Sequence, residues 1–85
     1  MSITILYFAG LREALGTGRE TLDLPPGVGT TAQLRAWLRQ RGAPWAEALA
    51  EGRAVRIAVD QAMARADTPL PPGAEVAFFP PVTGG

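Results

Sequence analysis

The chain has 85 residues, 47% of them apolar, and eight basic against eight acidic side chains, which leaves a formal net charge of zero. This length supports one modest core that buries roughly 60% of the unfolded surface, without a deep internal pocket, and the charge balance gives no electrostatic case for nucleic acid or an anionic membrane as partner. No apolar run approaches the roughly 20 residues of a membrane helix and the N-terminus lacks the pattern of a signal peptide, so we expect a cytoplasmic protein.

The first quarter of the chain carries two strand signals around a short helix. Residues 3–8 are β-branched and aromatic, which predicts a buried or half-buried strand. Residues 10–16 suit a short helical turn. Residues 19–24 alternate polar side chains with leucine, which indicates a hairpin partner strand that stops at Pro25.

The strongest helix signal begins at Thr30. Thr30 or Thr31 can cap the helix, and Gln33 stands three residues after Thr30, as in a capping box. Gly42 stands where a C-terminal stop belongs. The apolar stripe of this helix comprises Leu34, Trp37 and Leu38.

The second half of the chain returns to strands. A second short helix can open at Pro44 and end at Gly52. A strand then follows, with the alternating residues Val55, Ile57 and Val59. A turn at Asp60 and Gln61 leads to a short strand over residues 62–65, and a loop rich in proline precedes the last strand, residues 75–79.

This order, β-β-α-β-β with one long helix after the first hairpin, predicts an α+β fold of the β-grasp (ubiquitin-like) type. The helix packs on one face of a mixed sheet and provides the crossover that lets the first and last strands lie parallel. We expect residues 1–79 to form this domain and residues 80–85 to form an extended C-terminal tail ending in Gly-Gly.

Alternation along the strands separates the two faces of the sheet. The face assigned to the core carries Ile3, Ile5, Tyr7, Val76 and Phe78. The uncovered face carries Leu6, Phe8 and Phe79. An apolar patch on a small domain is a candidate partner surface, although ordinary partly buried sheet residues would give the same pattern.

The residue inventory excludes most catalytic chemistry. The sequence contains no Cys, His or Lys, so thiolate nucleophiles, Cys/His zinc sites, histidine bases and Schiff-base lysines are absent from it. One reactive group remains, the terminal carboxylate. Any chemistry in which this protein takes part therefore depends on groups that a partner supplies.

The tail suits insertion into a partner. Pro80 and Pro81 stop the last strand and favour a stiff, extended exit, and the six residues after Phe79 reach roughly 20 Å when fully extended. Gly84 and Gly85 lack side chains, so the end is narrow enough to thread into another protein's active site. A frayed end of a glycine-rich chain is the alternative.

The end of the sequence, Glu75-Val-Ala-Phe-Phe-Pro-Pro-Val-Thr-Gly-Gly85, resembles the C-terminal signature of the molybdopterin synthase small subunits, sulfur carriers of the ubiquitin-like MoaD/ThiS family. Residues 5–13, Ile-Leu-Tyr-Phe-Ala-Gly-Leu-Arg-Glu, and residues 58–61, Ala-Val-Asp-Gln, add to the resemblance, which covers the whole chain. One departure is Asp60, where the family often has Asn in the turn.

The resemblance implies that the protein is a sulfur donor rather than an enzyme on its own. A ubiquitin-activating-like adenylyltransferase would consume ATP to adenylate Gly85, and the acyl-adenylate would become a C-terminal thiocarboxylate. The synthase large subunit would then transfer this sulfur to cyclic pyranopterin monophosphate and form the molybdopterin dithiolene. The resemblance also implies a heterotetramer of two small and two large subunits, with no cofactor or metal bound to the small subunit.

Site roles follow from this resemblance for individual residues. Gly85 carries the covalent chemistry and Gly84 is a slim spacer. Val82 and Thr83 line the partner's channel, and Pro80 and Pro81 set the direction of the tail. The apolar anchors against the partner are Phe79, Phe8 and Leu6. Arg12 is a candidate for pairing with a partner's acid, although a solvated charge beside Glu13 is the simpler interpretation.

Three other functions share parts of this pattern. A thiamin-pathway sulfur carrier has the same fold and Gly-Gly end but is typically shorter and lacks the Phe-Phe-Pro-Pro run. A ubiquitin-like protein modifier would use the same activated Gly85 with a lysine acceptor. A non-covalent β-grasp interaction module would not need the tail.

Overall fold

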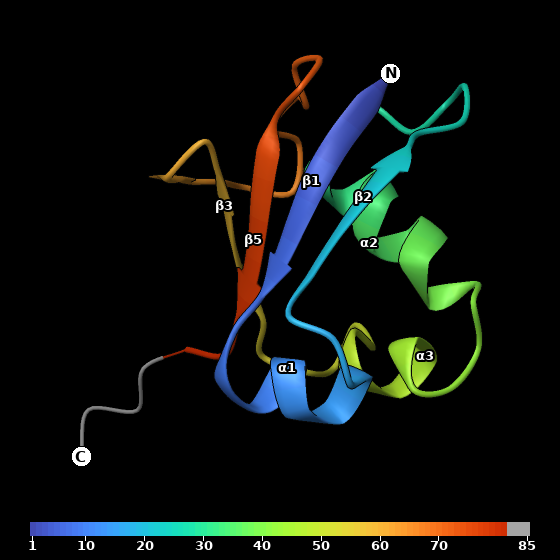
Figure 1. Ribbon diagram of the computed structural model, residues 1–85, viewed down its shortest axis with the longest axis vertical. Helices are drawn as coiled ribbons and strands as arrows, with labels where there is room; N and C mark the ends of the chain where they lie inside the picture. Colours follow the sequence, from blue (N-terminus) through green and yellow to red (C-terminus); the bar gives the residue numbers. More distant parts are fainter. Residues whose placement is uncertain (82–85) are drawn as a thin grey trace.

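The structure, a computed structural model that describes residues 1–81, is built around one five-stranded mixed sheet (Figure 1). Its elements in chain order are β1 Ser2–Tyr7, α1 Ala9–Leu15, β2 Arg19–Asp23, α2 Thr31–Arg39, α3 Trp45–Ala48, β3 Arg56–Val59, β4 Ala62–Met63 and β5 Glu75–Phe79. The strand order is β2-β1-β5-β3-β4. The β1–β5 pair is parallel and the other pairs are antiparallel. The predicted β-grasp arrangement, with parallel first and last strands, is confirmed.

Helix α2 covers one face of this sheet, as the sequence predicts. The side chain of Thr30 accepts a hydrogen bond from the backbone N–H of Gln33, and the Gln33 side chain accepts one from the backbone of Thr30, so the capping box is present. Leu34 and Leu38 are fully buried, and Trp37 packs partly buried against the core. The N-terminal start of α2 and its apolar stripe are therefore both confirmed.

The assignment of the two sheet faces is also confirmed. The residues predicted for the core have at most 1% of their surface exposed: Ile3, Ile5, Tyr7, Val76 and Phe78. On the opposite face Leu6 and Phe79 are half-buried. A helix can cover only one face of a sheet this small, so the other face keeps its apolar side chains accessible.

The strand after the Asp60–Gln61 turn is shorter than expected. The sequence predicts residues 62–65, whereas β4 ends at Met63. The physical reason lies at the start of α2, where the hydroxyl of Thr31 donates to the carbonyl groups of Arg65 and Ala66. These bonds draw the chain away from β3 and toward the helix.

The Asp60–Gln61 turn itself is held by the carboxylate that departs from the family pattern. Asp60 and Gln61 both have positive φ, 49° and 70°. Asp60 Oδ1 accepts a hydrogen bond of 2.9 Å from the backbone N–H of Glu75, at the start of β5. An aspartate at position 60 therefore provides the hydrogen-bond acceptor that connects this turn to β5.

No helix among the described residues is long and apolar enough to cross a membrane.

Candidate functional site

The uncovered face of the sheet carries a continuous apolar strip at the end from which the chain leaves β5. The strand register places Leu6 beside Ala77, Ala77 beside Ala58, and Ala58 beside Met63. Phe79 lies one row further along, opposite Arg56. Ala58 is itself buried, with 7% of its surface exposed, and the larger side chains around it form the accessible part of the strip. We call the following six residues the open-face patch: Leu6, Phe8, Ala58, Met63, Ala77 and Phe79.

Phe8 belongs to this patch although β1 ends one residue earlier. Its backbone remains extended, with φ −120° and ψ 155°, and its N–H donates to the carbonyl of Phe78 at 3.1 Å. The alternation of β1 therefore continues through Phe8 and directs its side chain to the uncovered face. The side chain is 47% exposed, which is a large exposure for a phenylalanine.

Met63 is a member of the patch that the sequence analysis missed. Its side chain is 58% exposed and it pairs with Ala58 across the β3–β4 hairpin. The signal was present, because a two-residue turn at Asp60 and Gln61 fixes the hairpin register and sets Met63 beside Ala58. Methionine is common at binding surfaces, since its unbranched, polarizable side chain adapts to a partner.

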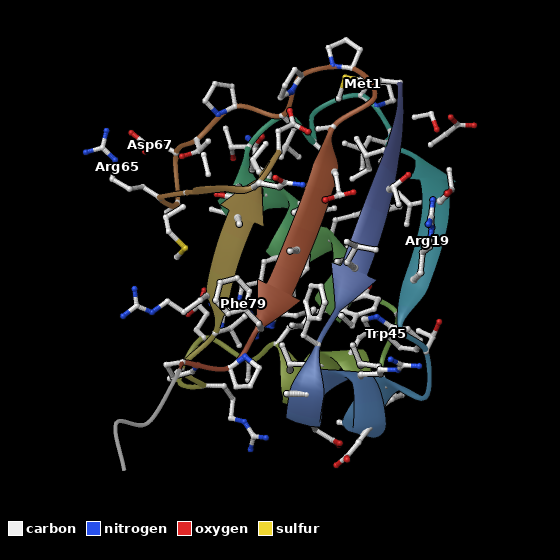
Figure 2. The ribbon with its side chains drawn as sticks, turned by 60° about the vertical axis from the view of Figure 1, so that its left-hand side comes forward. Met1, Arg19, Trp45, Arg65, Asp67 and Phe79 are labelled. Carbon is white, nitrogen blue, oxygen red and sulfur yellow. The ribbon has the colours of Figure 1, made fainter. Side chains whose placement is uncertain are left out.

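The chain leaves the sheet beside Phe79. Figure 2 shows Phe79 at the end of β5, where the chain turns out of the sheet. Pro80 and Pro81 follow and are half-buried. Neither has an N–H for a further ladder bond, so the strand ends there. The residues predicted to enter a partner lie outside the described residues: Val82, Thr83, Gly84 and Gly85.

Arg12 lies on α1 and its side chain extends over the turn before β2. A Cβ atom on Gly18 would lie 3.0 Å from Arg12 Nε, so a larger residue at position 18 would displace the Arg12 side chain slightly. Arg12 is exposed. Its predicted pairing with a partner's acid stays a prediction.

A polar cluster on the helix side of the sheet joins β1 and β2 to the loop after α2 and to α3. The Tyr7 hydroxyl donates to Glu20 Oε2 at 2.8 Å, and Arg41 makes a bidentate pair with the same carboxylate at 2.8 and 2.9 Å. Trp45 Nε1 donates to the Tyr7 hydroxyl at 3.3 Å. The guanidinium of Arg41 lies 4.8 Å from the centre of the Trp45 ring, a cation–π contact.

The electrostatics of this cluster favour a fixed charge state. Burial raises the pKa of Tyr7, and the hydrogen bond to Glu20 adds to that shift, so the phenol is neutral. The bidentate bond from Arg41 lowers the pKa of Glu20. Tyr7 also stacks on Phe78, with ring centroids 5.9 Å apart. The cluster therefore connects the ends of β1 and β5 to β2 and α3.

Metal ligands do not gather in the part of the chain that the structure describes: no group of three or more Asp, Glu, Cys or His side chains in residues 1–81 could hold a metal ion.

Comparison with known proteins places this chain in a family. The family model described as ThiS family matches residues 5–85. This chain belongs to the ThiS family. Two curated relatives are each named molybdopterin synthase sulfur carrier subunit. The Escherichia coli protein is 41% identical and the Haemophilus influenzae protein 36% identical, each over 83 residues that cover 98% of this chain and 99% of the relative.

Solved structures share the fold of this ThiS family member. A Pyrococcus furiosus chain described as molybdopterin converting factor, subunit 1, superposes with a TM-score of 0.78 at 27% identity, covering 96% of this chain and 99% of that one. A complex of subunits 1 and 2 of the molybdopterin-converting factor from Helicobacter pylori contains a chain with a TM-score of 0.66 at 23% identity, with both chains fully covered. The resemblance seen in the sequence is therefore confirmed.

Proposed function

We propose that this ThiS family protein is the sulfur-carrier small subunit of molybdopterin synthase. The full-length match to two curated sulfur carrier subunits of that enzyme carries the proposal. It favours this function over a thiamin-pathway carrier or a protein modifier. The absence of Cys, His and Lys from the sequence agrees with a subunit that brings a reactive terminus and no catalytic side chain.

The proposed chemistry takes place at Gly85. A carboxylate with a pKa near 3.5 is ionised at neutral pH and is a poor electrophile, so it must be activated. Attack of the Gly85 carboxylate on the α-phosphate of ATP releases pyrophosphate and gives an acyl-adenylate. A donor of sulfide-level sulfur then attacks the acyl carbon and expels AMP, so that a C–S bond replaces the C–O bond to the nucleotide and a thiocarboxylate remains. Because the ubiquitin-activating-like enzyme binds the ATP, the carrier itself needs no bound cofactor, and the consumption of ATP fits a cytoplasmic cycle.

The large subunit is the proposed acceptor and partner. In the Helicobacter pylori complex a chain of this fold is associated with a second subunit. We infer that the open-face patch docks on the large subunit, with Phe79, Phe8 and Leu6 as anchors. Pro80 and Pro81 direct the tail into the partner's active site, where Val82 and Thr83 line the channel and Gly84 acts as the spacer. Two carriers on a dimer of large subunits would form a heterotetramer.

Intact-mass measurement tests the first half of the cycle. The protein is incubated with ATP, a sulfur source and its activating enzyme, and replacement of one oxygen by sulfur is the expected change. A variant that lacks Gly85 is the control and shows no change. An unchanged mass with an activating enzyme that charges a related carrier would contradict the proposal.

Adding the large subunit and cyclic pyranopterin monophosphate tests the second half. The thiocarboxylate form is expected to yield the dithiolene and to return to the carboxylate form. Transfer to a thiazole precursor, or an isopeptide bond to a lysine of another protein, would instead identify the carrier as a thiamin-pathway protein or as a modifier.

A further inference from the structure

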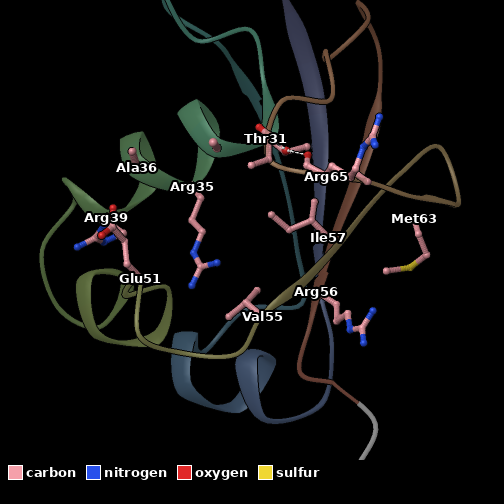
Figure 3. A pocket seen from close by; sticks show the side chains of 13 residues that line it. Thr31, Arg35, Ala36, Arg39, Glu51, Val55, Arg56, Ile57, Met63 and Arg65 are labelled. Carbon is pink, nitrogen blue, oxygen red and sulfur yellow. Dashed lines mark hydrogen bonds and ion pairs between the residues drawn. The ribbon is translucent and has the colours of Figure 1, made fainter.

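A second surface lies on the helix side of the sheet. A half-open groove of about 330 Å³ runs between α2, the segment that leads into β3, and the segment after β4 (Figure 3). Its apolar lining consists of Ala32, Ala36, Val55, Ile57, Met63, Ala64 and Ala66. Ile57 pairs with Phe78 and shares its face, whereas the open-face patch lies on the other face. The groove is therefore a surface separate from the patch, with Met63 at the border of both.

Positive charge surrounds this groove. The groove is lined by Arg35, Arg39 and Arg65 against a single acid, Glu51. Arg56 also borders it, but its register opposite Phe79 places its side chain on the uncovered face. Figure 3 shows Arg35 pointing from α2 into the space before Val55 and Ile57, with Arg56 and Arg65 on either side of Met63 at the opposite rim. Glu51 lies 3.7 Å from Arg39 and its side chain is 90% exposed, so this ion pair neutralises little of the charge.

One hydrogen-bond donor at the groove has no partner among the described residues. This donor is the buried Nε of Arg39. A buried polar atom without a partner calls for an unseen one, such as a water molecule or a ligand atom. Burial, followed by the nearby charge of Arg39, lowers the pKa of Arg35. An anion bound between the two guanidinium groups would relieve this repulsion.

The edge of the sheet is open at Val55, the residue before β3, where the chain borders the groove. Asp60 N–H donates to Glu75 on β5, so by alternation Ile57 and Val55 direct their backbone groups away from β5. The β3–β4 ladder comprises two residue pairs, and Ala64 N–H then donates to the carbonyl of Ile57. No described strand lies beside Val55, so its N–H and C=O are available to an added strand.

We propose that this groove binds an extended acidic segment of a partner protein, whose backbone pairs with the open edge at Val55, immediately before β3. The uncovered edge at Val55 recognises the peptide backbone, the apolar wall takes alternate side chains, and the arginines take the carboxylates. A small inorganic anion would use only the arginines. The segment occupies the helix side of β3, so it can bind while the open-face patch and the tail engage the large subunit. The inference does not rest on the proposed function.

A synthetic peptide is the probe for this surface. The capped heptapeptide Asp-Val-Glu-Ile-Glu-Val-Asp alternates acidic and apolar side chains, as a strand in the groove requires. We expect titration into the ¹⁵N-labelled full-length protein to shift the amide signals of Val55, Ile57 and Ala64 and the Nε–Hε signal of Arg39. A peptide with Asn and Gln in place of the acids tests the charge. Two further peptides, N-methylated at the odd or at the even residues, test the backbone hydrogen bonds. Alternate residues of a strand direct their N–H groups to opposite sides, so only one of the two peptides is expected to lose affinity.

Arginine variants provide the matched comparison on the protein. Arg39→Gln and Arg65→Gln are each expected to weaken peptide binding about five-fold, which is the range of partly exposed charge pairs. Arg19→Gln, at the opposite edge of the sheet, is the control and leaves the affinity unchanged. Arg35 is left intact because it holds the loop before β3. Thermal unfolding of each variant verifies that the fold is retained.

The pattern of shifted amide signals distinguishes the possible outcomes. Groove-specific shifts that need both the acids and the backbone N–H groups support the proposal. Equal binding of the neutral peptide, or shifts centred on the open-face patch, would overturn it. Shifts of the same amides with sodium sulfate alone, and no added effect of the peptide, would assign the groove to small anions and also overturn it.

Discussion

Two adjacent phenylalanines at the end of β5 give a matched pair of perturbations. Phe78 is fully buried and stacks on Tyr7. Phe79 is half-buried and lies on the uncovered face, opposite Arg56. Replacing each by Ala removes the same atoms from two different surroundings. The comparison therefore tests the face assignment directly.

The expected costs differ several-fold. Phe78→Ala opens a cavity in a closed core and is expected to lower the free energy of unfolding by about 3–5 kcal/mol. A domain of this length has a total stability of roughly 4–13 kcal/mol, so this variant is expected to unfold at least about 12 °C earlier. Phe79→Ala leaves no enclosed cavity and removes only a partly buried ring, so about 1 kcal/mol is expected.

Urea unfolding followed by tryptophan fluorescence measures the two stabilities, and calorimetric titration with the large subunit measures binding. We expect Phe79→Ala to weaken that binding at least about ten-fold, as a central aromatic anchor does. Phe79→Leu serves as the control that keeps an apolar anchor. A loss of stability in Phe79→Ala as large as in Phe78→Ala would contradict the assignment of Phe79 to the uncovered face. An unchanged affinity in a stable Phe79→Ala would remove the patch from the proposed interface.

Three further predictions concern the polar contacts behind the sheet. Glu20→Ala is expected to lower the free energy of unfolding by about 2 kcal/mol, because Arg41 loses its bidentate partner and the buried Tyr7 hydroxyl loses its acceptor. Glu20→Gln keeps an acceptor and is expected to lower it by about half as much. The bidentate bond from Arg41 lowers the pKa of Glu20 in the folded state, so the contribution of this carboxylate is complete above the unfolded pKa and is lost as the pH falls through the folded pKa. The stability difference between wild type and Glu20→Gln, measured by urea unfolding, is therefore constant at neutral pH and shrinks as the pH falls below the unfolded pKa of 4.5. Arg35 donates to three carbonyl groups of the segment between α3 and β3. Arg35→Gln is therefore expected to lower the free energy of unfolding, measured by thermal unfolding, by about 2 kcal/mol. Arg35→Lys is expected to be destabilised as well, because an ammonium group lacks the planar arrangement of donors of a guanidinium.

Each of these expectations can be contradicted by one result. A Glu20→Ala variant as stable as wild type would mean that the pair with Arg41 contributes nothing in water. A constant difference between wild type and Glu20→Gln across the acid range would remove the assigned cause of the pKa shift. Full stability of Arg35→Lys would show that the charge near the loop matters and the fork geometry does not.

Local patterns predicted most of the architecture because their determinants are close in sequence. The capping box of α2 involves Thr30 and Gln33, three residues apart, and β5 matches the predicted residues 75–79. The alternation of apolar residues in β1 fixed which face meets the helix. The error at β4 had a non-local cause, since the bonds from Thr31 that end it span more than thirty residues.

The candidate site divides in the same way. Leu6, Phe8 and Phe79 could be found from strand alternation alone, whereas Met63 joins them only through the hairpin register. The pair between Glu20 and Arg41 spans 21 residues, and the sequence carries no pattern that links them. The arginine-lined groove likewise draws its members from α2 and from both sides of the β3–β4 hairpin.

By itself the sequence determined that this protein has few catalytic side chains, an apolar alternation that leaves one sheet face uncovered, and a slim Gly-Gly end. Composition, period and covalent order are one-dimensional properties, so no structure was needed to read them. The tertiary structure decided which distant residues meet: the cluster around Glu20, the position of Met63, and the groove beside β3. Such contacts depend on strand register and on how α2 crosses the sheet, and these are fixed only when the whole core packs.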